Sequence, residues 1–415
     1  MMKPQVIFLM IAASAMADEA VDVSARINGF GMDFHQRISK DGGNQVTSPW
    51  SISAALAMVY AGADGETREQ MARTLHFEGD EKELHDGVSA LAADLNELAR
   101  VSQLQIAKSE RRGGPNTPIE ITTANRLFGQ EGQDFEAPFV DLLAERYQAR
   151  LMRVDFLHQR EKARDEINQW VERQTQGRIS DLIPAGALDE QTRLVLTNAI
   201  FMKAPWAEEF QPEPDQPFFI NSEEEIRVDG MQRRGTLGFA EITNASMITI
   251  PYHGGGLQFL LILPKLGVDL HVVESGLNAG QLRQAARLDQ REIILHMPKF
   301  KLSPGRVMLS SHLKQMGMPS AFDQPVGSAN FSRMAIRKPD DYLFIGEVVH
   351  QAFIDVNCHG TEAAAATAVL MMRSLSVRPS EESPLEIRID RPFLFAVQHV
   401  ASGTCLFLGR LVDPR

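Results

Sequence analysis

Cysteine is scarce in this chain, and features that would divide it into separate units are absent. Only Cys358 and Cys405 occur among 415 residues, so disulfides do not supply the structural framework. Both fall in runs typical of strands, which favours two free, buried thiols. There is no internal repeat and no linker rich in Pro, Gly or Ser. Although length alone suggests two or three domains, these absences predict one large domain over residues 18–415.

The usual motifs of catalysis are also missing. The sequence contains no Gly-x-Ser-x-Gly elbow, no His-Glu-x-x-His pair, no phosphate loop and no Cys-x-x-Cys. Its 11 histidines are scattered, and the neighbours Cys358 and His359 would point to opposite faces of a strand. We therefore expect a protein that is not an enzyme and that holds no metal and no cofactor. An enzyme of an unrecognised type is the unsupported alternative.

Positive charge is in deficit. With 42 basic and 54 acidic residues, the formal net charge is −12, and nothing indicates binding to nucleic acid or another polyanion. Beyond the N-terminus no apolar run is a candidate membrane span. The expected partners therefore include neither nucleic acid nor a membrane.

The N-terminus has the pattern of a secretory signal peptide. Lys3 precedes an apolar core from Val6 to Ala13, and Ala15-Met16-Ala17 ends it with small residues at the positions that flank a cleavage site. Removal of residues 1–17 would leave a secreted or periplasmic protein. The alternative is a disordered or buried N-terminal helix.

Helical and strand patterns alternate along the rest of the chain, which predicts an α+β domain. Val23, Ile27, Phe30, Phe34 and Ile38 have the spacing of one helix face. Thr67 and Gln70 have the spacing of a capping box before another helix. Two runs, Leu194–Met202 and Met247–Leu263, are strand-like, and the second would turn at the three glycines 254–256.

The most informative segment runs from Gly360 to Ala368, between two runs that are typical of strands (Tyr342–Val356 and Pro392–Val400). The 35 or so intervening residues are long for a connection in a compact domain. The first half lacks proline up to Pro379, so it could become a central strand. One face of that strand would carry only uncharged residues, beginning with Thr361 and Ala363, while Glu362 would lie on the other. The pattern indicates a switchable strand or, alternatively, a flexible Ala-rich linker.

Together these motifs resemble the serpin family. Thr361–Thr367 is similar to the serpin hinge, Ser48-Pro49-Trp50-Ser51-Ile52 to the Ser-Pro-x-Ser-Ile segment, and Thr197–Trp206 to the Thr-Asn-Ala-Ile strand. Further motifs of the family follow along the chain in the family's order, and the resemblance covers about residues 30–415. It implies a serpin fold with three β-sheets, eight to nine helices and an exposed reactive-centre loop at about 358–390.

The resemblance implies a suicide-substrate inhibitor of serine proteases, which traps the acyl-enzyme by inserting its cleaved loop into the main sheet. The implied partner is a serine protease or, alternatively, a papain-like cysteine protease, and the protein would be a monomer with a risk of polymerisation. The hinge residues it assigns are Gly360, Thr361, Glu362, Ala363, Ala364, Ala365, Ala366 and Thr367. A non-inhibitory carrier or binding protein with the same fold is the alternative function.

The reactive bond determines the target. We place it at Arg373-Ser374, because Arg373 is the only basic residue between the hinge and Arg378, and a trypsin-like pocket requires a cation. The family's commonest spacing instead puts the cut after Ser374, before Leu375, which suits an elastase- or subtilisin-like enzyme. Cleavage after Met372 would suit a chymotrypsin-like one. Arg373 could also serve only to keep the loop soluble.

Six further residues match positions that the family uses to control opening of its main sheet. Ser48, Ser51, Asn198 and His350 match the polar cluster beneath the sheet centre, while Trp206 and Lys299 match residues near the top, where the loop inserts. Each could equally be an ordinary core residue. One position departs from the family: Cys358 stands where an acidic residue usually pairs with the lysine that Lys299 matches. Without that ion pair, the top of the sheet either opens more readily or is closed by another contact.

Overall fold

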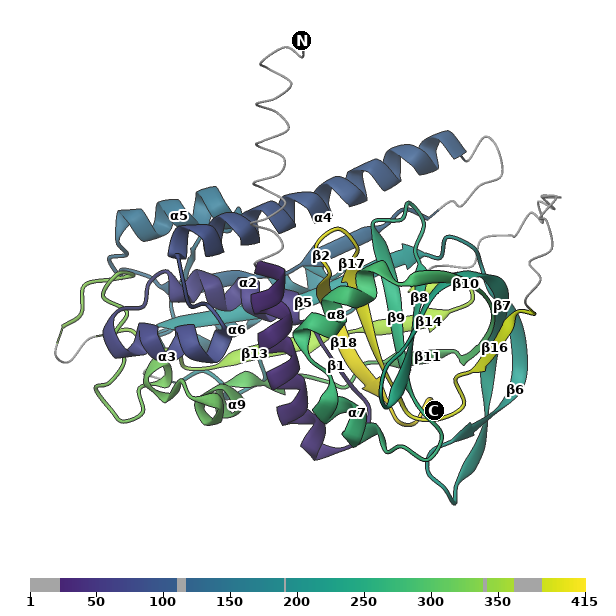
Figure 1. Ribbon diagram of the computed structural model, residues 1–415. Coiled ribbons are helices and arrows are strands. Elements are labelled where there is room, and N and C mark those ends of the chain that lie inside the picture. Colours follow the sequence, from purple (N-terminus) through teal and green to yellow (C-terminus); the bar gives the residue numbers. More distant parts are fainter. Residues whose placement is uncertain (1–22, 110–116, 190–191, 339–341, 362–382) are drawn as a thin grey trace, which may run out of the picture.

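The computed structural model describes residues 23–109, 117–189, 192–338, 342–361 and 383–415 (Figure 1). These residues form nine α-helices, the first over 23–38. The others are α2 (Pro49–Tyr60), α3 (Gly65–Leu75), α4 (Glu81–Ser109), α5 (Ala137–Tyr147), α6 (Arg160–Gln174), α7 (Leu270–Gly276), α8 (Ala279–Gln284) and α9 (Leu309–Met316). Within the described part of the chain, no helix combines the length and the apolar character that a membrane crossing requires.

The first network of hydrogen-bonded strands is dominated by the 17-residue strand β7. The last residues of β7 pair with β8, while its first residues pair with β6 and its middle with β10. One long strand therefore joins two groups of strands. The nine members are β1 (Gln45–Thr47), β6 (Gln211–Phe219), β7 (Glu225–Glu241), β8 (Ala245–Pro251), β9 (Leu257–Pro264), β10 (Asp289–Pro298), β16 (Leu385–Arg388), β17 (Phe393–His399) and β18 (Thr404–Leu411).

The second network is built around β5, which pairs with strands on both of its edges. Its nine members among the described residues are β2 (Glu120–Thr123), β3 (Arg126–Gln130), β4 (Met152–Val154), β5 (Leu194–Pro205), β11 (Phe300–Leu302), β12 (Val307–Met308), β13 (Val348–Ala352), β14 (Ile354–Asn357) and β15 (Gly360–Thr361). The described strands thus form two hydrogen-bonded networks where the sequence predicted three sheets, because β7 pairs with β6, β8 and β10 and joins all of them into one network. The α+β fold with eight to nine helices is confirmed.

Burial on both faces explains why β9 is apolar except for Gln258. Phe259 and Leu261 belong to the main core, which lies between this strand and the sheet of β5. The side chains between them, Leu260 and Ile262, pack on the opposite face with residues of α7 and α8. Because both faces are covered, the strand has no polar side to alternate with. The prediction of a strand pair over Met247–Leu263 is confirmed as β8 and β9.

The first helix follows its predicted pattern, and its five spaced apolar residues are at most 5% exposed. The capping-box prediction at Thr67 is wrong, because α3 begins two residues earlier, at Gly65. Thr67 is fully buried and accepts a hydrogen bond from the backbone N–H of Asn330, while the Gln70 carboxamide oxygen accepts one from the Ser320 N–H. These polar side chains therefore connect α3 to the segment 319–330 instead of starting a helix.

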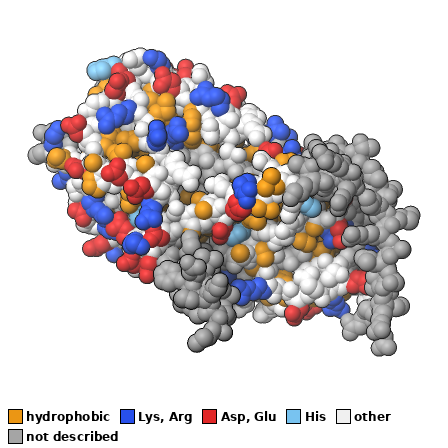
Figure 2. Space-filling view, turned by 90° about the horizontal axis from the view of Figure 1, so that it is seen from above, with side chains coloured by type: hydrophobic (Ala, Val, Ile, Leu, Met, Phe, Trp, Pro, Cys, Tyr) orange, Lys and Arg blue, Asp and Glu red, His pale blue; other side chains and the backbone are white. Residues whose placement is uncertain are grey.

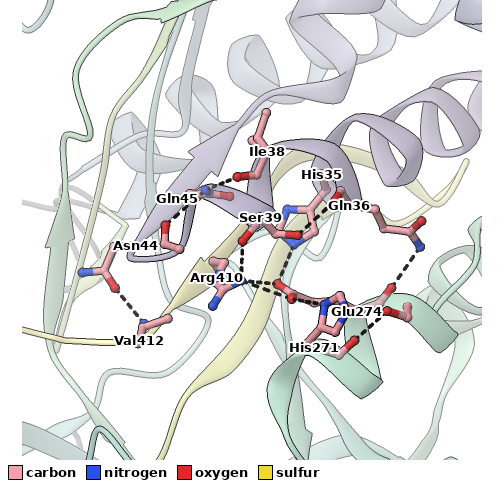
Figure 3. A network of polar contacts seen from close by, with 12 residues as sticks. His35, Gln36, Ile38, Ser39, Asn44, Gln45, His271, Glu274, Arg410 and Val412 are labelled. Carbon is pink, nitrogen blue, oxygen red and sulfur yellow. Dashed lines mark hydrogen bonds and ion pairs between the residues drawn. The ribbon is translucent and has the colours of Figure 1, made fainter. Parts of the chain in front are cut away.

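A buried polar network ties the first helix to α7 and to the C-terminal strand β18 (Figure 3). Glu274 on α7 is 1% exposed and accepts hydrogen bonds from the Arg410 guanidinium at 3.1 and 3.2 Å. The His35 ring lies 3.2 Å from the same carboxylate. Arg410 also donates to the Ser39 carbonyl. Charges buried this deeply require partners, so the network fixes how these three elements meet.

Acidic and basic side chains are interspersed on one face of the molecule (Figure 2). On the left of the face seen in Figure 2 they lie next to one another instead of gathering by sign. Asp86 of α4 illustrates this, since it pairs with Lys82 at 2.6 Å and with Arg146 of α5 at 2.8 Å.

Both described cysteines are buried free thiols, as expected from sequence.

Candidate functional site

The two central parallel strands of the second network separate part of the way along. Strands β5 and β13 pair from Leu196 and Val348 to Ile200 and Ala352. Beyond this point the short strand β15 lies between β5 and β14 and is antiparallel to both. Gly360 and Thr361, the first two residues of the expected hinge, therefore already belong to the sheet. The other expected hinge residues, Glu362–Thr367, and the expected reactive bond, Arg373-Ser374, lie outside the described residues.

Gly360 lets β15 approach β5 closely. A Cβ atom at this position would stand 2.1 Å from the Ala204 carbonyl oxygen and 2.7 Å from the Pro205 Cα. Both are backbone atoms of the central strand and cannot move aside without breaking the sheet. Any side chain at residue 360 is therefore incompatible with this pairing.

The side chain of Thr361 points into the core. It is 1% exposed, and its hydroxyl forms a hydrogen bond with the hydroxyl of Tyr252. Tyr252 is itself fully buried, which raises its pKa far above the ordinary value. Its ring stacks on Trp206 at a centroid distance of 4.6 Å. A buried hydroxyl here requires a hydrogen-bonding partner, and Thr361 provides it.

At the end of the sheet next to β15, Cys358 stands where the resemblance implies an acidic partner for Lys299. Other contacts hold the strands together there. The Trp206 indole N–H donates to the Asn357 carbonyl at 2.8 Å, and the Trp206 backbone N–H donates to the His359 carbonyl at 2.9 Å. The Phe210 N–H donates to the Cys358 carbonyl at 2.9 Å. The sequence left open whether this end would be loose or held by another contact, and the structure has the second arrangement.

Lys299 has no ion pair among the described residues. It is close enough to Cys358 to act on the thiol electrostatically, but burial dominates and raises the Cys358 pKa. His359 instead forms the local contact with a carboxylate, with Nδ1 lying 3.0 Å from Glu209 Oε1. Trp206 and Lys299 therefore differ: the first is central to the contacts at this end, and the second only borders them.

The four residues expected beneath the sheet centre do form one network. His350 and Asn198 are register partners on β13 and β5 and are hydrogen-bonded to each other through His350 Nδ1. The Asn198 amide donates to the Ser51 carbonyl at 2.6 Å and to the Ser51 hydroxyl at 2.8 Å. Ser48 caps α2 by accepting from the Ser51 N–H at 3.0 Å. All four side chains are fully buried.

Hydrogen bonding assigns the protonation of His350. Its Nε2 accepts from the Ser48 backbone N–H at 3.2 Å, so the ring proton resides on Nδ1 and is donated to the Asn198 carboxamide oxygen. Burial lowers the pKa of His350 to about 3. The network is therefore satisfied by a neutral ring and would be disrupted by an added proton on Nε2.

Two members of the site were not found from the sequence. Asn125, between β2 and β3, accepts from the Asn198 amide at 2.7 Å and donates to the Ser51 carbonyl at 3.0 Å. Tyr252 reaches Thr361 from the end of β8. Neither residue belongs to a motif, and no local pattern in the sequence marks either one. Among the described residues, no group of three or more His, Cys, Asp or Glu side chains could hold a metal ion.

Comparison with known proteins agrees with this arrangement. The family model described as Serpin (serine protease inhibitor) matches residues 25–414. A leukocyte elastase inhibitor from Bos taurus is 38% identical over 383 residues, covering 90% of this chain and 93% of the relative. Serpin B6 from Pongo abelii is 36% identical over 405 residues, covering 95% of this chain and 100% of the relative.

Solved structures show the same fold. Human thyroxine-binding globulin aligns with a TM-score of 0.77 at 26% identity, covering 95% of this chain and 99% of that one. Uncleaved ovalbumin aligns with a TM-score of 0.77 at 27% identity, covering 94% and 100%. Serpin48 of Tenebrio molitor aligns with a TM-score of 0.75 at 27% identity, covering 95% and 98%.

Proposed function

The chain belongs to the serpin family, whose curated relatives are named inhibitors rather than catalysts, and we propose that it traps a serine protease by inserting its cleaved loop between β5 and β13. The observation that carries the proposal is the pairing of Gly360 and Thr361 with both β5 and β14 in the intact chain. The direction, register and buried face of a further strand are thereby already set.

Continuing that register gives the inserted arrangement. Residue 361 pairs with Ala204, so each following residue of an antiparallel strand would pair with the preceding residue of β5. Thr367 would then come between Asn198 and His350 and separate their side-chain contact. The residues on the Thr361 face would be Ala363, Ala365 and Thr367, none of them charged. The polar network thus stabilises the closed sheet, and insertion must break its hydrogen bonds.

The length of β5 limits how far insertion can go. Its 12 residues would pair with residues 360–371, a strand of about 40 Å at about 3.3 Å per residue. Only Met372 and Arg373, or these and Ser374, would then tether an acylated protease at the far end of the sheet. The energy for this movement comes from the new backbone hydrogen bonds and from burial of the small hinge residues.

For the scissile bond we propose Arg373-Ser374, cut by a trypsin-like protease. Arg373 supplies the only cation between the hinge and Arg378, and such proteases pair it with a buried carboxylate. A second candidate is Ser374-Leu375, cut by an elastase- or subtilisin-like protease. The names of the leukocyte elastase inhibitors among the relatives favour this alternative. A serine protease, rather than a papain-like cysteine protease, is the proposed partner.

Two further proposals concern the state of the protein. Residues 1–17 are a signal peptide, so that the mature chain is secreted or periplasmic. The family match starts at residue 25, after the expected cleavage site. The mature chain is monomeric, with a risk of polymerisation, because β5 and β13, once separated, could accept a strand from a second copy. Sequencing the N-terminus of exported protein and measuring its mass in solution test these points.

The function is tested by incubating the mature chain with trypsin, a chymotrypsin-like protease and an elastase-like protease. We expect one of them to form a complex that survives denaturing electrophoresis, with release of a C-terminal peptide. If the peptide begins at Ser374, the Arg373 bond is the reactive one, whereas a peptide beginning at Leu375 selects the second candidate. Cleavage within 370–378 without any stable complex would contradict inhibition and favour a non-inhibitory binding protein.

A further inference from the structure

Strand β16 holds the chain on the C-terminal side of the expected loop, as β15 holds it on the N-terminal side. Among the described strands, β16 pairs with β10 alone, over four residues that begin at Leu385. The Ile389 backbone N–H adds one hydrogen bond to the His296 carbonyl oxygen at 2.8 Å. At the right of Figure 1, β16 lies at the edge of the strands β6, β7 and β10. Because an edge strand has a neighbour on one side only, side-chain contacts with that neighbour contribute much to its attachment.

His296 of β10 is buried between two carboxylates that belong to different strands. Its Nδ1 lies 2.6 Å from Glu213 Oε2 on β6, and its Nε2 lies 3.5 Å from Glu386 Oε1 on β16. The residue is 5% exposed. Nε2 is inaccessible to water and forms no hydrogen bond within the described part of the chain. One imidazole ring therefore lies between β16 and a carboxylate on the far strand of this group.

The charge of the ring decides whether its contact with β16 is favourable. Nδ1 must carry a proton, because the Glu213 carboxylate can only accept a hydrogen bond. A neutral ring would then direct the Nε2 lone pair at the Glu386 carboxylate and leave a buried acceptor unpaired, which costs stability. A protonated ring would direct an N–H and a positive charge at the same oxygen. Protonation thus converts a repulsive contact between β10 and β16 into an attractive one.

The surrounding charges leave a positive charge on His296 without a competitor. The arginines on the neighbouring strands already have carboxylate partners: Arg388 pairs with Glu386, Arg234 with Glu292, and Arg233 with Glu208. Gln232, the register partner of His296 on β7, carries no charge. Glu213 forms no ion pair with a lysine or arginine of the described segments. The two carboxylates at His296 are therefore balanced by one arginine alone, and a protonated ring supplies the second positive charge.

We propose that protonated His296 holds β16, and with it the C-terminal end of the reactive loop, against β10. The attachment weakens as the pH rises through the range in which histidine loses its charge, about pH 5 to 8. This inference rests on the function proposed above for one consequence: if β16 detached, the loop would be held at β15 only, and its reactive bond would no longer be presented in a fixed position. The attachment of β16 itself does not require a protease.

Hydrogen exchange of the full mature chain, followed by mass spectrometry, tests the proposal. The peptide that contains residues 385–389 reports the local opening of β16, after correction for the intrinsic pH dependence of amide exchange. We expect the equilibrium constant for opening to be at least about threefold larger at about pH 7.5 than at about pH 6. A single titrating group changes this constant by at most about tenfold per pH unit.

Two substitutions identify the titrating contact. Glu386→Gln removes the carboxylate that faces Nε2 at a position whose side chain is 52% exposed, and it should abolish most of the pH dependence of β16 opening. His296→Gln keeps a donor for Glu213 but carries no charge, and should have the same effect. The matched control is Glu292→Gln, which removes a carboxylate of β10 that pairs with Arg234 instead. It should keep the wild-type pH dependence.

Equal opening of β16 at the two pH values in the wild-type chain would overturn the proposal. Equal pH dependence in Glu386→Gln and Glu292→Gln would overturn it too, because the titrating group would then lie elsewhere. Circular dichroism checks folding, and the two glutamate variants decide the matter if His296→Gln does not fold. Because exchange is measured without a protease, a failure of this inference is distinguishable from a failure of the inhibitory function, which only the complex-formation assay detects.

Discussion

The hydroxyl groups of Tyr252 and Thr361 are hydrogen-bonded to each other inside the protein core. This contact means that the chain enters the main sheet before any protease has acted. Thr361 is as buried as the core residues around it, so the face it shares with Ala363 and Ala365 is committed to the interior from its first residue.

Thr361→Arg is expected to convert the inhibitor into a cleaved substrate. A charged side chain cannot be accommodated in the core position that Thr361 occupies without a cost of several kcal/mol, so β15 should leave the sheet and loop insertion should lose its starting point. The protease should then deacylate before insertion is complete, and the yield of stable complex should fall at least about tenfold. The measurement is the ratio of complex to cleaved chain on a denaturing gel.

Thr361→Val is the matched control for that substitution. It keeps the shape of the side chain and removes only the bond to Tyr252, so it should still form complexes. Stable complexes with Thr361→Arg at wild-type yield would show that insertion does not proceed through this position.

Gly360→Ala should displace β15 from the sheet, because its Cβ would lie 2.1 Å from the Ala204 carbonyl oxygen. Loss of the Thr361 contact would follow, and the environment of Trp206, which stacks on Tyr252, should change its fluorescence. We expect slower loop insertion and a lower complex yield. Gly346→Ala is the control, since a Cβ there meets no atom within 4 Å. The same fluorescence change in both variants would refute the close-approach explanation.

The sequence predicted the elements well where one physical signal determined them. The spacing of Phe30 and Phe34 predicted a helix face, and the apolar run around Leu260 predicted a buried strand. Thr67 was misassigned, because a polar residue near a helix start can cap that helix or bond to a distant segment, and only tertiary packing decides between them.

The candidate site was predictable only in part, and for a related reason. Ser48, Ser51, Asn198 and His350 belong to motifs, and the structure brings them into one network. Asn125 and Tyr252 complete the site through contacts across more than 70 and 100 residues, which no local pattern reports. The outcome at Cys358 also depended on tertiary structure, since the contacts that replace the missing ion pair come mainly from backbone atoms.

Substitutions at the proposed reactive bond distinguish its two candidate positions. Arg373→Ala should reduce complex formation with trypsin by at least about 100-fold if the bond is Arg373-Ser374, because the protease loses the cation that its pocket binds. Ser374→Arg should have the opposite effect only if the bond is Ser374-Leu375, where it would create a trypsin site. Association rates with trypsin and elastase provide the readout. Unchanged trypsin inhibition in Arg373→Ala would exclude the first bond.

Glu274→Gln is expected to destabilise the fold by about 3 kcal/mol. The substitution removes the carboxylate from a position that is 1% exposed and leaves the partly buried Arg410 guanidinium without its counter-charge. Urea unfolding followed by circular dichroism measures the loss. Glu69→Gln is the control, because Glu69 is exposed and lies 3.9 Å from an exposed Arg73, where a pair contributes at most about 1 kcal/mol. Equal effects of the two substitutions would contradict a structural role for the buried network.

His350 should make the closed sheet sensitive to acid. Burial lowers the pKa of His350 to about 3 in the folded protein, against about 6.5 in the unfolded chain. Between these values the unfolded state binds more protons, so stability falls as the pH falls from about 6.5, by at most about 1.4 kcal/mol per pH unit, and is unaffected by this group above pH 7. His350→Gln offers the same acceptor to Ser48 and the same donor to Asn198 without titrating. Urea unfolding between pH 7 and pH 4.5 should therefore show a shallower loss of stability in the variant than in the wild type. Parallel pH profiles would mean that His350 is not the group whose protonation opens the sheet.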